Sequence, residues 1–115
     1  MKLKNNQTYI IAEIGVNHNG SLSLAKKMIF KAKKSGADAI KLQSYISSEI
    51  TSVKALTADY QSKKKFSQLS MLKKYELSEE KQIKLYKYCK KIKIDFLSSA
   101  FDLKSLRFLK SLKLN

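Results

Sequence analysis

The sequence begins with a strand, a helix and a second strand in close succession, and this order constrains the fold more than any other feature. Residues 9–14 (YIIAEI) are apolar and rich in isoleucine, which predicts a strand. Residues 22–32 carry apolar side chains at helical spacing, between a candidate N-cap at Ser21 and a candidate left-handed C-terminal cap at Gly36. A second strand is predicted at residues 38–43 (DAIKLQ). Because a helix connects them, the two strands should run parallel in one sheet.

The rest of the chain continues this alternation after a less regular segment. Residues 44–77 are too many for a bare connection, so we expect structure within them, including a short helix near residues 66–72. Ser78 is a candidate N-cap for a clearer helix, and a third strand is predicted at residues 94–98 (IDFLS). Asp102 is a candidate cap for a last helix. The leucines expected on one face of that helix are Leu103, Leu106, Leu109 and Leu112. This order predicts an α/β architecture with about three parallel strands.

Size and composition are typical of one globular domain that spans residues 1–115. The chain is 43% hydrophobic and 29% charged, which argues against a disordered protein. No apolar run approaches the ~20 residues of a membrane helix, and residues 1–6 (MKLKNN) contain no apolar signal-peptide core. We therefore expect a cytoplasmic protein without a membrane partner. Cys89 is the single cysteine, so it forms no internal disulfide and is expected to pack on a helix as a small apolar group.

The formal net charge of +15 raises the possibility of nucleic-acid binding. Two features argue against it. Arg107 is the only arginine, although arginine is the better bidentate reader of phosphates and guanine edges. The lysines are also spread along the whole chain, as on solvated helix faces. We predict no nucleic-acid partner, and expect the positive field to attract an anionic substrate.

Polar residues occur at the carboxyl end of each predicted strand, where parallel α/β folds bind their ligands. The first strand offers Glu13, the second offers Lys41 and Gln43, and the third offers Ser98 and Ser99. A carboxylate, an ammonium, an amide and hydroxyl groups should therefore meet at one rim of the sheet.

Lys41 and Gln43 lie two residues apart, so on a strand they face the same side, while Ile40 and Leu42 face the helices. A lysine inside a parallel strand is costly unless it is paired or faces a ligand. Two interpretations stay open: a site for a phosphate or carboxylate ligand, and a buried ion pair between Lys41 and Glu13.

The loop after the first strand contains His18, the only histidine of the chain. A metal site needs several ligands, so His18 is predicted to be a hydrogen-bonding loop residue rather than a metal ligand. Gly15 and Gly20 suit backbone conformations that other residues resist. They form neither the G-x-G-x-x-G fingerprint nor a P-loop.

Four segments of the chain together form a family pattern. They are residues 11–20 (IAEIGVNHNG), residues 36–44 (GADAIKLQS), residues 67–77 and residues 96–102 (FLSSAFD). These segments resemble, in order, the opening motif, the second-strand motif, the S-Q-x-x-M-L…E-L stretch and the F-L-S-T-P-F-D motif of the sialic acid synthase (N-acetylneuraminate synthase) family. The resemblance covers nearly the whole chain.

The resemblance implies a TIM barrel followed by a small antifreeze-like domain, in an enzyme that condenses phosphoenolpyruvate with an N-acylated amino sugar. It implies a divalent metal, Mn²⁺ or Mg²⁺, with ligands outside this chain, and a homodimer. By position, Lys41 would hold the phosphoenolpyruvate anion and Gln43 would contact the amino sugar. Glu13 would be the active-site carboxylate, and Ser99 stands where the family has a phosphate-contacting threonine.

The chain also departs from the family pattern. Ala100 replaces a proline, which is expected to loosen the turn after the third strand. A closed barrel typically needs about 250 residues, so we expect the N-terminal portion of a barrel, as a fragment, a truncated reading frame or half of a split gene. Residues 54–61 favour the sialic and legionaminic branch. The alternatives are a non-catalytic relic and, ranked last, a basic nucleic-acid-binding module.

Overall fold

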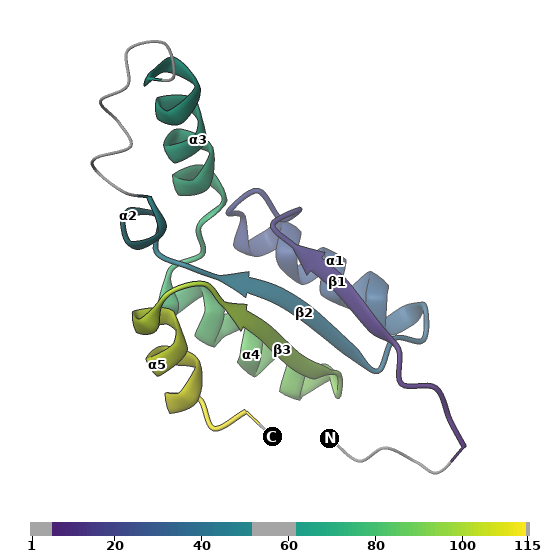
Figure 1. Ribbon diagram of the computed structural model, residues 1–115. Coiled ribbons are helices and arrows are strands. Elements are labelled where there is room, and N and C mark those ends of the chain that lie inside the picture. The colour runs from purple at the N-terminus through teal and green to yellow at the C-terminus, as the bar shows by residue number, and fades with distance from the viewer. Residues whose placement is uncertain (1–5, 52–61, 115) are drawn as a thin grey trace.

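A computed structural model describes residues 6–51 and 62–114 of the chain, with the side chains of residues 62–68 left out. Three strands and five helices alternate in these residues (Figure 1). They are β1 (Ile11–Gly15), α1 (Leu22–Lys34), β2 (Ala39–Ser44), α2 (Ser47–Ile50), α3 (Ser62–Tyr75), α4 (Glu79–Ile92), β3 (Asp95–Ala100) and α5 (Leu103–Ser111).

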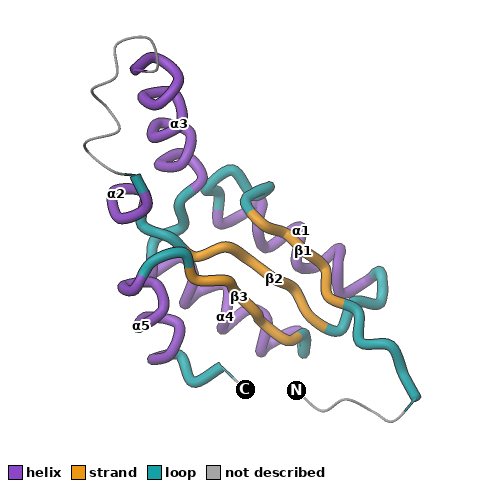
Figure 2. The backbone as a smooth tube through the Cα atoms, viewed as in Figure 1, coloured by secondary structure: helices purple, strands orange, loops and turns teal. Residues whose placement is uncertain are grey.

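The strands form one parallel sheet, as predicted, and lie in the order β1-β2-β3. In the register, Glu13 is opposite Lys41 and Gln43 is opposite Ser99, so the predicted rim residues lie on neighbouring strands. Helices α1 and α4 cover one face of the sheet, and α3 projects from the carboxyl ends of the strands (Figures 1 and 2). None of the described helices lies across the opposite face, which we call the open face.

The hydrophobic core lies between the sheet and the layer of α1 and α4. Ile40 and Leu42 of β2 point into it and are fully buried, which confirms the predicted alternation. Ile29 from α1 and Leu85 from α4 meet them there. Burial of apolar surface stabilises the fold by about 25 cal/mol per Å², so the apolar face of each strand packs against the helices. The polar face of each strand is therefore turned away from them. Cys89 is buried in the same core, and burial raises its thiol pKa to about 12, so it packs as an apolar group.

The predicted helix caps are present. The Ser21 hydroxyl accepts a hydrogen bond from the Leu24 N–H, and the Ser78 hydroxyl accepts one from the Lys81 N–H. Asp102 caps α5 by accepting from the Ser105 N–H. Gly36 follows α1 with φ +89°, a left-handed conformation that suits glycine.

Two expectations for the helices need correction. The helix predicted near residues 66–72 is longer, because α3 spans Ser62–Tyr75. The leucines of α5 do not share one buried face: Leu109 is buried, whereas Leu103 and Leu106 are 71% and 54% exposed. Three residues turn a helix by about 300° rather than a full circle, so a series spaced by three drifts around the helix. Residues 54–61, on which the predicted sialic and legionaminic branch rests, lie outside the described residues.

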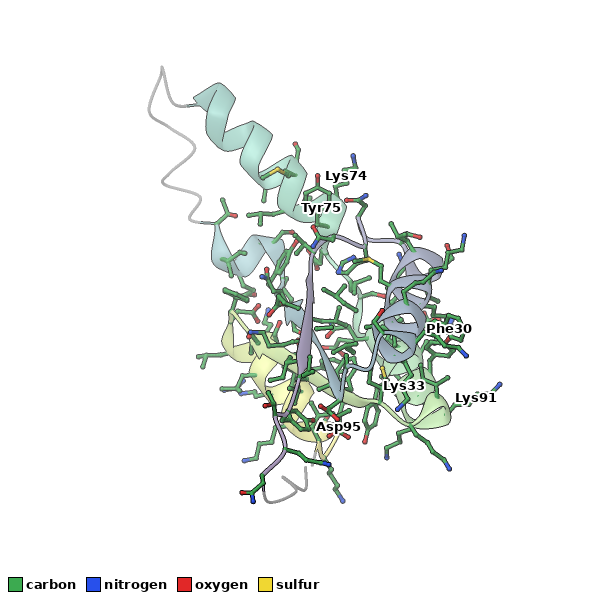
Figure 3. All side chains as sticks on the ribbon, turned by 90° about the vertical axis from the view of Figure 1, so that its right-hand side faces the viewer. Phe30, Lys33, Lys74, Tyr75, Lys91 and Asp95 are labelled. Carbon is green, nitrogen blue, oxygen red and sulfur yellow. The ribbon has the colours of Figure 1, made fainter. Side chains whose placement is uncertain are left out.

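Most of the described lysines of α1 and α4 occupy solvated helix faces, as predicted. Lys27, Lys31, Lys33 and Lys34 are exposed on α1, and Lys84, Lys87, Lys90 and Lys91 on α4. Figure 3 shows Lys91 on the outer side of this layer, away from the sheet. Lys33 instead donates from its Nζ to the Lys93 carbonyl, between α4 and β3, at 2.6 Å. No helix in the described residues is long and apolar enough to cross a membrane.

Candidate active site on the open face

The open face carries the polar side chains that the sequence placed at the strand ends. Ile14 and Leu42 are buried on the helix side, so strand alternation turns Glu13 and Lys41 to the open face. Gln43 and Ser99 lie on the same face, two residues nearer the carboxyl ends of their strands than Lys41 and its partner Leu97. The sheet therefore brings together all four residues for which the family resemblance implies a role.

Glu13 and Lys41 form an ion pair, with 2.7 Å between the Glu13 Oε2 and the Lys41 Nζ. The side chains are 47% and 39% exposed, so the pair is not buried, contrary to one of the two interpretations of the sequence. The reason is that no described element covers this face. Exposed ion pairs contribute at most about 1 kcal/mol, so the pair contributes little to stability. Its ammonium and carboxylate remain accessible to a ligand.

Gly15 brings the Glu13 carboxylate and the Gln43 amide close to one point. Its φ is +56°, and the sheet register shifts between Glu13 and Gly15. A Cβ atom at Gly15 would lie 3.6 Å from Gln43 Nε2 and 3.7 Å from Glu13 Oε1. A side chain there would therefore occupy the space between these two groups. The sequence marked Gly15 only as a backbone residue, and its place in the site depends on the neighbouring strand.

The two serines of β3 face opposite sides of the sheet. Ser99 faces the open side, opposite Gln43. Ser98 instead turns to the helix side, where its Oγ lies 2.6 Å from the Ser44 Oγ. Ser98 therefore does not join the rim, and strand alternation relative to Phe96 was the signal that could have excluded it.

Ala100 does not disrupt the end of β3. The strand runs through Ala100, which is paired with Ser44. The Phe101 N–H then donates a hydrogen bond to the Ser44 carbonyl at 3.0 Å. The turn that was expected to be loosened is thus held to β2 by the backbone.

His18 is the fully buried centre of the loop between β1 and α1. Its Nδ1 accepts a hydrogen bond from the Gly20 N–H at 3.0 Å, which confirms its predicted role as a loop hydrogen-bonding residue. In a neutral ring the proton must then be on Nε2, which has no partner among the described residues. Burial lowers the pKa of His18, and this effect outweighs the opposing influence of the Gly15 backbone, while the nearby positive charge of Lys81 also lowers it.

Contacts from α3 and α4 hold this loop in place. Lys81 of α4 donates from its Nζ to the Gly20 carbonyl at 2.8 Å. Gly20 has φ +72°, and a Cβ atom there would lie 2.3 Å from the Lys74 carbonyl oxygen at the end of α3. Only glycine fits such a contact, so the loop that follows Glu13 is packed between distant parts of the chain.

The part of the chain that the structure describes does not fit a metal site. No group of three His, Cys, Asp or Glu side chains lies close enough together there to hold an ion. What the open face does offer is an ammonium for an anion, an amide and a hydroxyl for polar groups, and a carboxylate that can hold water or a proton.

Comparison with known proteins identifies what these residues are similar to. The NeuB family model matches residues 28–115. The N,N'-diacetyllegionaminic acid synthase of Campylobacter jejuni is 48% identical over 94% of this chain and 33% of its own length. That of Legionella pneumophila is 43% identical over 90% of this chain and 30% of its own length. This chain thus spans about a third of the length of these relatives.

Solved structures support the same relationship. The N-acetylneuraminic acid (sialic acid) synthetase of Leptospira borgpetersenii, solved in complex with citrate, superposes with a TM-score of 0.76 at 29% identity. The superposition covers 99% of this chain and 38% of that structure. The three parallel strands and their helices therefore have the arrangement of one part of that protein.

Proposed function

Because this chain belongs to the NeuB family, we propose that it supplies three strands of a barrel that condenses phosphoenolpyruvate with an N-acylated amino sugar. The observation that carries the proposal is the Lys41–Glu13 pair on the open face, 2.7 Å apart and half exposed. Relatives named as synthases at 43% and 48% identity support it, and their names favour a legionaminic-type product.

The proposed reaction forms one carbon–carbon bond and releases phosphate. C3 of phosphoenolpyruvate bonds to the aldehyde carbon of the open-chain sugar, and the aldehyde oxygen takes up a proton. Water adds to C2, and the bond between C2 and the phosphate oxygen breaks. The products are a nonulosonic keto acid and inorganic phosphate.

The four open-face residues would divide this work by their chemistry. The Lys41 ammonium would bind the phosphoenolpyruvate anion, because a charged donor to an anion gives the stronger kind of hydrogen bond. Ser99 would donate its hydroxyl to the same anion, and the Gln43 amide would contact the sugar. Glu13, whose Oε2 is 2.7 Å from Lys41 Nζ, would position water or carry a proton once the anion binds to Lys41.

A divalent metal remains an expectation for the whole enzyme. The described residues do not fit one, so we derive no step through it and expect its ligands outside them. The cytoplasmic location and the homodimer expected from the sequence are likewise part of the proposal.

The test is complementation. We would co-express this chain with the segment of the Campylobacter jejuni synthase that the chain does not cover, and measure phosphate release from phosphoenolpyruvate with an N-acyl mannosamine. We expect activity that needs both pieces and is lost in Lys41→Ala. The matched control is Lys27→Ala, which removes an exposed lysine from the outer side of α1 and should leave the rate unchanged.

The opposite outcome is equally clear. A well-folded complex that releases no phosphate would contradict the proposal and favour a relic without catalysis. Equal activity in Lys41→Ala and Lys27→Ala would show that the reaction does not use the open face.

A further inference from the structure

A chain of buried hydrogen bonds lies directly beneath the carboxyl ends of β2 and β3, on the helix side of the sheet. Ser44 is fully buried and its hydroxyl lies 2.5 Å from Gln82 Oε1. The Ser98 Oγ lies 2.6 Å from the Ser44 Oγ. The Gln82 Nε2 lies 2.9 Å from the Leu77 carbonyl oxygen, and Gln82 is only 4% exposed.

The direction of this chain is fixed from one end. The Leu77 carbonyl can only accept, so the Gln82 amide must point its NH₂ there and its oxygen toward Ser44. Gln82 Oε1 can only accept, so Ser44 donates its one proton to it. Ser98 must then donate to Ser44 or to the Leu42 carbonyl, 3.2 Å away. Gln82 of α4 thus orients the Ser44 hydroxyl, whose oxygen is one of the two acceptors within reach of Ser98.

These residues sit where the rest of the sheet uses apolar side chains. Ile40, Leu42 and Phe96 fill the equivalent helix-side positions deeper in the core. Buried polar groups give stability only when every partner is present, and an apolar replacement would pack as well. The hydrogen bonds therefore serve geometry at this end of the strands more than stability.

We propose that Gln82 is a positioning residue for Gln43 and Ser99, an inference that rests on the proposed function for its catalytic meaning. Ser44 directly follows Gln43, and Ser98 directly precedes Ser99. Because side chains alternate along a strand, holding Ser44 and Ser98 toward α4 holds their two neighbours on the open face. The register pairs Gln43 with Ser99, so one helix residue sets both.

The experiment uses two readouts on Gln82→Met and Ser44→Ala, with Leu85→Val as the matched control. Methionine keeps the length of glutamine without its hydrogen bonds. Leu85 is buried one turn further along α4 and lies outside the hydrogen-bonded chain. In the 115-residue protein by itself, NMR follows the amide signals of Gln43 and Ser99. In the complemented synthase, kinetics follow KM and kcat.

We expect the Gln43 and Ser99 signals to shift in both network variants and to stay in place in Leu85→Val. The KM for substrate should rise roughly tenfold with kcat nearly unchanged, as for lost positioning of binding groups. The double variant should be no worse than either single variant, because both break the same chain.

Two results separate the ideas. Unmoved Gln43 and Ser99 signals in Gln82→Met and Ser44→Ala would overturn the positioning role, whatever the activity. If the Gln43 and Ser99 signals shift in the two variants but the wild-type complex makes no product, the positioning role is upheld and the synthase proposal is refuted.

Discussion

At the scale of single residues, Glu13 and Lys41 show that a conspicuous contact need not be a stabilising one. Their ion pair is short, at 2.7 Å, but water reaches both side chains. The free-energy cost of desolvating the two charges is therefore small, and so is the stabilisation from their Coulomb attraction. Such a pair keeps two charged groups in place on an otherwise uncovered sheet face, which suits a binding site better than a structural brace.

This separation of stability from function is testable with Lys41→Met, which keeps most of the aliphatic stem. We expect the free energy of unfolding to change by less than about 1 kcal/mol, the range for an exposed pair. The measurement is urea denaturation, with Leu85→Ala as the contrast, because a buried leucine-to-alanine change costs about 2–5 kcal/mol. A loss in Lys41→Met as large as that in Leu85→Ala would mean that the pair is structural.

Gly20 and Gly36 form a matched pair for separating strain from steric contact. Both have positive φ, but a Cβ atom at Gly20 would meet the Lys74 carbonyl at 2.3 Å, while one at Gly36 would meet nothing within 4 Å. Gly36→Ala should cost only the conformational strain, about 1 kcal/mol. Gly20→Ala should cost clearly more, since backbone must move as well. Equal losses in thermal stability would contradict the close contact between the loop and α3.

His18 predicts how stability depends on pH. Burial lowers its pKa in the folded chain below the ordinary value of about 6.5. Protons then bind the unfolded state more strongly, so the contribution of His18 is complete above that ordinary value and declines as pH falls toward the folded pKa. Protonation would also remove the acceptor for the Gly20 N–H.

The measurement is the free energy of unfolding between pH 7.5 and pH 5. We expect it to fall as the pH is lowered, by at most about 1.4 kcal/mol per pH unit from one group. His18→Gln is the control: because His18 is the only histidine, this variant should lose most of the dependence in that range. A wild-type curve that is flat down to pH 5 would contradict the burial of a neutral imidazole.

At the scale of elements, Asp102 links two connections that follow neighbouring strands. Its carboxylate accepts from the Ser105 N–H at the start of α5 and from the Ile46 N–H after β2, both at 2.8 Å. Partial burial disfavours its charge, but these hydrogen bonds outweigh burial and lower its pKa. The cap therefore also ties the carboxyl end of β2 to that of β3.

We expect Asp102→Ala to cost more than Ser78→Ala, which removes a cap that accepts from one backbone N–H. A single cap is worth about 1 kcal/mol, and the Ile46 hydrogen bond should add to that for Asp102. Denaturant unfolding of both variants provides the comparison. Equal costs would show that the bond to Ile46 contributes nothing.

At the scale of the whole molecule, helices cover one face of the sheet, whereas none of the described helices covers the other. Helices α1 and α4 bury the apolar side of the sheet, and their lysines face water (Figure 3). On other surfaces, Ile11, Phe101, Leu103 and Leu106 are large apolar side chains at least 47% exposed. Apolar exposure of this kind marks surfaces that another part of a protein covers.

We therefore expect the chain by itself to be marginally stable and to bind a hydrophobic dye. Dye fluorescence should fall when the complementary segment of the Campylobacter jejuni synthase is co-expressed, because that segment would cover the exposed side chains. Fluorescence with and without the segment is the measurement. A soluble monomer with a sharp cooperative melt and no dye binding would contradict this expectation.

Much of this molecule is determined locally, and that part was predictable. Strand alternation placed Lys41 and Gln43 on one face and Ile40 and Leu42 on the other, because the backbone itself imposes a period of two. The caps at Ser21, Ser78 and Asp102 were readable because each bonds an N–H three residues ahead. The parallel order followed from the helical connection between strands.

The features that only the tertiary structure decided all join residues distant in sequence. The Gly20 contact with Lys74, the burial of His18 and the hydrogen bond between Ser44 and Gln82 depend on how α3 and α4 return to the sheet. Likewise, the sequence predicted that Leu103 and Leu106 lie on the apolar face of α5, but whether they are buried depends on what packs against that helix. The sequence by itself determines local periodicity and caps, whose partners are near neighbours, whereas burial is set by packing between elements, which no local pattern records.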